Sequence, residues 1–378
     1  MLGGPLHWLG CRLSLVREGT HTVRLGLALS LLAWGVLIVL ALLQGLGLRL
    51  FSPAVMGVHV RFLVAVPLFF LCESLVAPGM AEFVRNIVHS GLVPESEMPT
   101  LASNVRRFGR MNNSWLAEVV FLLAAIASPI GEQFVRMPGM TANWTSIPGG
   151  AGNGLTWAHG WYLGFCLPLF RFLILRWVWR LGLWSYFLWR VRSLKLHLIP
   201  THSDGAAGLG YLDVVQEHFA PLAIATSAVL SASFLEDIFS GTMAFEELYL
   251  LIPVVLLLNV VLFISPLFIF SGKLWVCRAT GLNEYMAMAA RYVHAFDRKW
   301  VRGGNASGES QLGTTDLQSL ADLTNSVRVI HEMHWAPISQ RLLMTLAVST
   351  VVPLLPLALV KYPLAELAKK LFGALAGL

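Results

Sequence analysis

The sequence contains little charge: only 13% of its 378 residues are Asp, Glu, Lys or Arg, whereas 56% are hydrophobic. A soluble domain carries about a quarter charged residues, which keep its surface in contact with water. A chain this poor in charge could not cover a water-exposed surface, but side chains that face lipid can stay apolar. The composition therefore excludes an ordinary soluble protein and predicts an integral membrane protein.

Cysteine is scarce as well, and Cys11, Cys72, Cys166 and Cys277 lie far apart without a CxxC pair. Neither a disulfide framework nor a zinc site is indicated, so we expect four small, reduced packing residues. The net charge of +6 could suit nucleic acid, but the basic residues lie at the ends of apolar runs. That placement is typical of membrane proteins, and nucleic acid is not an expected partner.

Seven apolar runs are long enough to cross a bilayer, which takes about 20 residues of helix. The first has no small-residue cleavage site and is interpreted as a retained span, not as a signal peptide. The predicted fold class is all-α: a polytopic membrane helical bundle with about seven transmembrane helices. The runs are Leu25–Leu48, Phe62–Ala81, Trp115–Gly131, Trp157–Val178, Phe219–Leu235, Leu248–Gly272 and Leu342–Val360.

The basic residues are unevenly distributed between the two sets of connections. Most of the 27 lie before the first run or after the second, fourth and sixth, whereas the opposite set carries an acidic group that includes Glu236. Because connections rich in Lys and Arg stay inside, we expect a cytoplasmic N-terminus in a bacterial inner membrane. Leu364, Leu367 and Leu371 form an apolar stripe, which predicts an interfacial C-terminal helix; a half-inserted eighth span is the alternative.

Three regions are predicted along the chain. Residues 1–272 form a six-span membrane bundle, whose cytoplasmic loops 79–112 and 179–215 contain amphipathic helices. Residues 273–340 form a cytoplasmic helical hairpin with two amphipathic helices, which could hold a cytoplasmic partner. Residues 341–378 comprise the last span and the interfacial helix. The lipid bilayer is the expected partner, and a homo-oligomer is left open.

Charged residues inside the apolar runs are the sharpest functional signal, because an unpaired charge in the bilayer costs several kcal/mol. Glu73, Glu118 and Arg171 are predicted at similar depth in the inner parts of the second, third and fourth runs. We therefore predict a buried Glu73–Arg171–Glu118 cluster, which either joins helices or serves a proton- or cation-linked role. Arg61, farther out, is expected to extend to the lipid headgroups.

A second polar group lies in the connection after the fourth run. Its Asp-Gly sequence and glycines favour a turn with a helix cap. Two alternatives are a divalent metal, with His202 and Asp204 as candidate ligands, and an anion on backbone N–H groups. The later His331-Glu-Met-His334 lacks the i,i+4 spacing of a zinc protease and is expected to be a surface pair. The loop residues concerned are His202, Asp204, Gly208, Asp213, Glu217 and His218.

Two stretches carry a resemblance to a known family. Pro200-Thr-His-Ser-Asp-Gly-Ala-Ala-Gly-Leu-Gly210 and Asp316-Leu-Gln-Ser-Leu-Ala-Asp-Leu323 resemble marker stretches of a family of bacterial multi-span membrane proteins. The family pattern more often reads PTHPDRAGGLG, from which Ser203, Gly205 and Ala207 depart. The resemblance implies a bacterial inner membrane and seven spans, and it brings no activity.

The sequence leaves three functions open. The leading hypothesis is movement of an ion or small polar solute along the buried carboxylates. The alternatives are a membrane-embedded enzyme that acts on a lipid or other amphipathic substrate through the His202 and Asp204 loop, and a scaffold or sensor that uses residues 273–340. No catalytic residue or cofactor can be assigned, and transport is favoured over an enzyme.

Overall fold

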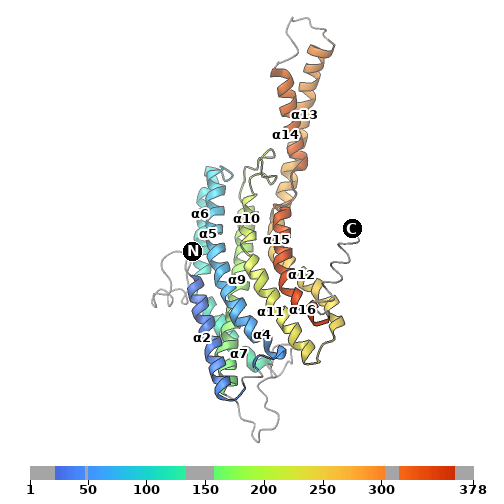
Figure 1. Ribbon diagram of the computed structural model, residues 1–378. Coiled ribbons are helices and arrows are strands. Elements are labelled where there is room, and N and C mark those ends of the chain that lie inside the picture. Colours follow the sequence, from blue (N-terminus) through green and yellow to red (C-terminus); the bar gives the residue numbers. More distant parts are fainter. Residues whose placement is uncertain (1–21, 47–49, 133–156, 303–314, 362–378) are drawn as a thin grey trace, which may run out of the picture.

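The structure, a computed structural model, describes all residues except 1–21, 47–49, 133–156, 303–314 and 362–378. In this described part every regular element is helical, and it contains no strand. The helices stand side by side in an elongated bundle, and one helical pair projects from one end (Figure 1). We call that end the hairpin end and the opposite one the far end. The predicted interfacial C-terminal helix lies outside the described residues.

Apolar runs form helices because a segment in lipid must satisfy its own backbone hydrogen bonds. Proline occupies the first or second position of α5, α6, α9 and α11, where its missing N–H breaks no helical bond. The helices are α2 (Thr22–Leu43), α4 (Met56–His59), α5 (Val66–His89), α6 (Met98–Asn112), α7 (Trp115–Glu132), α8 (Trp157–Trp161), α9 (Leu167–Arg192), α10 (Tyr211–Glu217), α11 (Ala220–Phe239), α12 (Leu248–Ile264), α13 (Ser271–Phe296), α14 (Thr315–Glu332), α15 (Gln340–Val351) and α16 (Leu355–Lys361).

Six helical runs in the described residues are long and apolar enough to cross a membrane. They correspond to six of the seven predicted spans, so the polytopic helical membrane protein expected from the sequence is confirmed. The remaining prediction, Trp115–Gly131, is the helix α7, which packs along α9 but is not one of the six. The six runs are Thr22–Leu43, Met56–His89, Trp157–Arg192, Tyr211–Phe239, Phe245–Val301 and Gln340–Ala358.

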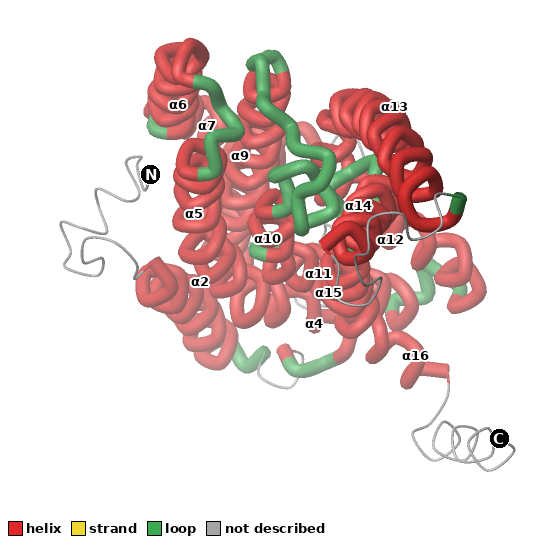
Figure 2. The backbone as a smooth tube through the Cα atoms, turned by 90° about the horizontal axis from the view of Figure 1, so that it is seen from above, coloured by secondary structure: helices red, strands yellow, loops and turns green. Residues whose placement is uncertain are grey.

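The helices α5 and α9 carry the largest share of the core. Both extend well beyond the predicted spans toward the hairpin end, because amphipathic segments continue the apolar ones without a break. Viewed along the bundle (Figure 2), α2, α5, α6 and α9 lie on one side, α12 to α15 on the other, and α10 and α11 between them. Aromatic rings fill the space between α5 and α9, for example Phe83 edge-on against Trp184.

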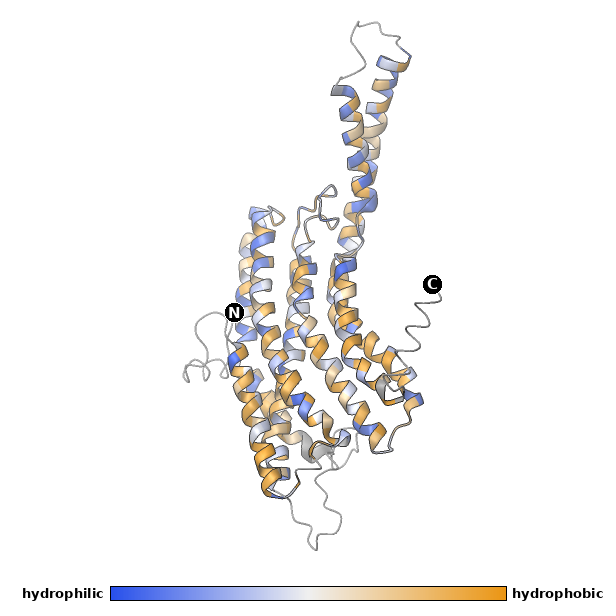
Figure 3. Ribbon diagram, in the orientation of Figure 1, coloured by the Kyte–Doolittle hydropathy of each residue, from blue (hydrophilic) through white to orange (hydrophobic). Residues whose placement is uncertain are grey.

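The projecting pair consists of α13 and α14, which pack against each other. A 3-10 turn, Ser265–Phe270, joins α12 to α13, so one helical run leads directly from the bundle into the pair. Near the tip Lys299 Nζ lies 2.8 Å from a carboxylate oxygen of Asp316. Hydrophobic residues dominate the bundle near its far end, whereas the pair mixes both kinds (Figure 3). That residues 273–340 lie in the cytoplasm stays a prediction.

Candidate functional site

A cluster of buried charges connects α5, α7 and α9. Arg180 donates from Nη2 to Oε1 of Glu73 at 2.8 Å, and Nη2 of Arg176 lies 3.4 Å from the same oxygen. Nε of Arg176 lies 3.6 Å from Oε1 of Glu118. The side chains of Glu73, Arg176 and Glu118 are all at most 10% exposed. We call Glu73, Glu118, Arg176 and Arg180 the inner cluster.

The structure brings the two predicted glutamates together and adds an arginine that the sequence interpretation did not name. The residue in contact with both carboxylates is Arg176, whereas Arg171 lies five positions earlier on α9 and is half-buried. Five residues rotate a helix by about 140° and shift it by about 7.5 Å, so the two arginines lie on different faces. Apolar runs define depth in the membrane but not the face of the helix, and the place of Arg171 in this cluster stays a prediction.

Arg180 also changes the charge balance of the cluster. The sequence interpretation placed two carboxylates with one arginine and expected a net negative charge. With both Arg176 and Arg180 in contact with Glu73, the four side chains carry two charges of each sign. Thr22 of α2 donates to the carbonyl of Phe70 at 3.2 Å, so α2 packs against α5 about one turn before Glu73.

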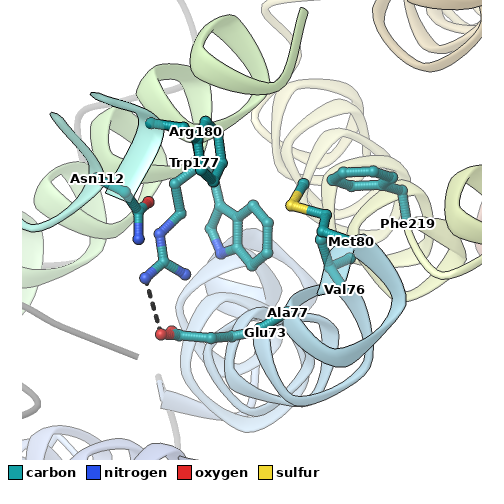
Figure 4. Close-up of a pocket in the computed structure, with 9 residues that line it drawn as sticks. Glu73, Val76, Ala77, Met80, Asn112, Trp177, Arg180 and Phe219 are labelled. Atoms are coloured by element: carbon teal, nitrogen blue, oxygen red, sulfur yellow. Dashed lines mark hydrogen bonds and ion pairs between the residues drawn. The ribbon is translucent and has the colours of Figure 1, made fainter. Parts of the chain in front are cut away.

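A small cavity reaches the Glu73–Arg180 pair. Its volume is about 30 Å³, which is room for at least one water molecule, and Trp177, Phe108 and Phe219 supply much of its apolar lining. Glu73 and Arg180 approach each other at one side, and Met80 and Phe219 lie on the other (Figure 4). Among the described residues that line the cavity, the one carboxylate and the one guanidinium are therefore paired with each other.

A second buried charge cluster lies toward the far end. Arg61 donates from Nη1 to the hydroxyl of Tyr162 at 2.7 Å, and its Nη2 lies 3.8 Å from Glu236. Oε1 of Glu236 also accepts the backbone N–H of Gly57 at 2.7 Å. Because Arg61 is only 6% exposed, the expectation that it extends to the headgroups was wrong. We call Arg61, Tyr162 and Glu236 the outer cluster.

The outer cluster was missed because its members belong to three separate runs of the sequence. Arg61 and Tyr162 lie in π-helical turns, Val60–Ala65 and Tyr162–Cys166. Such turns are rare and occur often at functional sites, because the extra residue re-aims neighbouring side chains. No sequence signal indicated them. Glu236 had been placed in an external acidic group instead of on a packed helix face.

The loop between α9 and α10 is organised by Asp204. Its Oδ1 accepts the backbone N–H of Ala206 at 2.9 Å, and its Oδ2 accepts those of Gly208 at 3.0 Å and Gly210 at 2.8 Å. Nδ1 of His202 lies 2.8 Å from Oδ1 of Asp204. Burial, the largest influence, raises the pKa of Asp204, but the three N–H bonds and His202 together lower it below its ordinary value.

This geometry supports the turn among the three interpretations of the loop. The backbone N–H groups that an external anion would need are donated to the carboxylate of Asp204. Both oxygens of Asp204, in turn, are occupied by those N–H groups. Among the residues the structure describes, no three His, Cys, Asp or Glu side chains are grouped so that they could hold a metal ion. Asp204 is therefore a structural residue in this loop.

The remaining loop residues position neighbouring helices. Asp213 accepts the backbone N–H of Ser339 at 3.1 Å, and Glu217 lies 3.0 Å from Nε of Arg341, so both hold the start of α15. His218 packs against α5, where an added Cβ at Gly79 would lie 2.5 Å from its Nδ1.

The predicted surface pair His331 and His334 lies at the base of α14. Both side chains are exposed. The backbone N–H of His334 donates to the carbonyl of Gly205 at 2.8 Å, and the carbonyl of His331 accepts from Arg278 at 2.6 Å. The backbone around the two histidines thus joins α13, α14 and the Asp204 loop.

Comparisons with known proteins do not assign the chain to a family. No family model matches the sequence, and neither a curated protein nor a solved structure is significantly similar to it. The resemblance carried by the PTHSDGAAGLG and DLQSLADL stretches therefore stays a prediction.

Proposed function

We propose that this protein moves protons across a bacterial inner membrane, along the seam between α5, α9 and α11. The observation that supports it best is the presence of buried charge clusters near both ends of this seam. Arg61 and Glu73 lie on the same helical run, and their separation of 12 positions corresponds to about 18 Å. Ionisable groups inside a membrane bundle mark ion pathways and proton relays more often than chance.

A proton fits the inner cluster better than a larger ion does. The cavity at Glu73 has room for water but not for a solute of several atoms. Because the cluster is balanced in charge, a metal cation at Glu73 would face two arginines. A proton on Glu73 would instead neutralise the carboxylate and weaken its contact with Arg180. The two side chains would then separate where they line the cavity.

The seam is closed between the two clusters. Phe62, Phe69 and Phe170 lie in this interval and are at most 5% exposed. Phe170 stacks on Phe69 and packs edge-on against Phe62, with ring centroids 6.0 and 6.4 Å apart. Water cannot pass through so dense a layer, so proton movement requires the helices to shift. The structure thus corresponds to a closed state of the proposed pathway.

Replacement of Glu73 tests the proposal. The purified protein is reconstituted into vesicles that contain a pH-sensitive dye, and a potassium diffusion potential drives protons inward. We expect wild-type vesicles to acidify faster than empty vesicles, and Glu73→Gln vesicles to match the empty ones.

Glu82→Gln is the matched control. Glu82 lies on the same helix and also pairs with an arginine, Arg85, but both side chains are exposed. This variant should keep the wild-type rate. A wild-type rate equal to that of empty vesicles would overturn proton movement. A normal rate for a well-folded Glu73→Gln variant would reduce the inner cluster to a link between helices.

The projecting α13–α14 pair favours a second candidate, a membrane scaffold that binds a cytoplasmic partner. The pair is fixed to the loop between α9 and α10, since Gly281 packs tightly against Pro200 and the backbone N–H of His334 donates to the carbonyl of Gly205. We infer the cytoplasmic side from the basic residues at that end. An enzyme that uses the Asp204 loop receives no support, because both oxygens of that carboxylate are occupied.

A further inference from the structure

A groove without a role in the proton proposal lies where α6, α7 and α9 meet. Its volume is about 620 Å³, which is in the range of small-molecule sites. Arg107 and Arg110 line one part of it, and Ala117, Val120 and Phe121 line another. It therefore combines a basic end with an apolar floor.

The exposed surface around the groove changes from polar to apolar between α6 and α7. On α6 the exposed side chains around it are arginines, whereas α7 exposes Leu116 and Val120 to more than half of their surface. Trp115, 64% exposed, begins α7 at the point where the exposed surface changes from polar to apolar. Tryptophan is enriched at this boundary because its ring is amphipathic.

The charge at the basic end of the groove is positive and unopposed. Arg107 and Arg110 are one helical turn apart and therefore lie on the same face of α6. None of the described residues that line the groove is acidic, and neither arginine forms an ion pair within the described part of the chain. The floor is firm, since Phe121 packs edge-on against Trp179 with ring centroids 5.9 Å apart.

We infer that this groove binds an anionic phospholipid, with the phosphate against Arg107 and Arg110 and an acyl chain along α7. Basic pockets between membrane helices at the cytoplasmic surface are suited to such headgroups. A free phosphate would use only the basic end and would leave the apolar floor exposed to lipid. The inference is independent of proton movement, because none of the four inner-cluster residues lines the groove.

Native mass spectrometry of the purified protein provides the test. The protein is exchanged into detergent with phosphatidylglycerol or with phosphatidylcholine, and the retained lipid is measured. We expect one phosphatidylglycerol to be retained, phosphatidylcholine to be lost, and millimolar inorganic phosphate to leave the retention unchanged. Arg107→Gln and Arg110→Gln should each lower retention about fivefold, the effect of one basic residue at an anionic surface.

Two further variants distinguish lipid bound in the groove from lipid attracted to the basic surface in general. Arg106→Gln removes the same charge from the neighbouring position, which is exposed but does not line the groove, and should retain the lipid. Ala117→Trp fills the groove without a change in charge and should lose it. Equal loss in Arg106→Gln and Arg107→Gln, full retention in Ala117→Trp, or equal retention of both lipids would each overturn the inference. Helical content and elution volume establish that each variant is folded.

Discussion

Removal of the Asp204 carboxylate should open the loop between α9 and α10. In the Asp204→Ala variant the backbone N–H groups of Ala206, Gly208 and Gly210 lose their acceptor. A buried donor without a partner costs about 1–3 kcal/mol, and the half-buried Gly210 can regain water. We therefore expect local opening to become easier by about 3 kcal/mol, which corresponds to about a hundredfold faster amide exchange.

Hydrogen exchange with mass spectrometry measures this effect directly. Peptides that cover residues 197–210 should exchange about a hundredfold faster in Asp204→Ala than in wild type. Asp204→Asn should fall between the two, because its amide keeps one acceptor oxygen but presents a donor to the remaining N–H groups. Ser203→Ala is the matched control, since Ser203 is the adjacent exposed residue. Exchange within threefold of wild type in Asp204→Ala would refute the reasoning.

The protection of this loop should also depend on pH in a defined direction. The pKa of Asp204 is lower in the folded protein than its ordinary value of 3.8, against the opposing effect of burial. The stabilisation is therefore fully present above that ordinary value and is lost as the pH falls through the folded pKa. We expect constant protection between pH 8 and pH 5, after correction for intrinsic exchange, and its loss only below 3.8. A loss near neutral pH would contradict this assignment.

Two more substitutions test the packing described above. Gly208 has a φ of +98° and an added Cβ would lie 2.8 Å from Leu92, whereas Gly91 has a φ of +68° with open space around it. Gly91→Ala should therefore lower the free energy of unfolding by about 1–2 kcal/mol, which is the cost of left-handed backbone for alanine. Gly208→Ala should lower it by more, because its Cβ also meets Leu92. Unfolding midpoints in detergent measure both effects. Arg176→Leu leaves two carboxylates without their shared arginine and should cost about 3–5 kcal/mol in the same assay; an unchanged midpoint would contradict the inner cluster.

The spans could be predicted because lipid imposes a simple rule on sequence. Any segment that crosses the hydrocarbon core must be helical and long enough, so apolar runs reveal the helices without knowledge of their packing. The continuation of α5 and α9 beyond the apolar runs followed from amphipathic stripes in the same way. The pairing of Glu73 with Glu118 through one arginine was also accessible, because sequential spans place residues at comparable depths.

The face of each helix was not accessible from the sequence, and for this reason the contacts of Arg176 and the burial of Arg61 were not predicted. Choosing between Arg171 and Arg176 requires the rotation of α9 against α5 and α7, which depends on the packing of side chains from all three helices. The burial of Arg61 requires contacts from Tyr162 and Glu236, far apart in sequence. The π-helical turns depend on the same tertiary contacts, since no local residue pattern specifies them.

The buried charges are better explained by function than by stability. A buried ion pair stabilises a protein little, because desolvation of both charges offsets their attraction, and apolar residues of similar size often do as well or better. A seam that needed only firm packing could use the aromatic residues that already fill it at Phe62 and Phe170. Charged side chains instead occur near both of its ends, each balanced by its neighbours, so that neutralising one carboxylate unbalances a whole cluster. That sensitivity to a single proton suits the proposed proton pathway, whereas a link between helices does not require it.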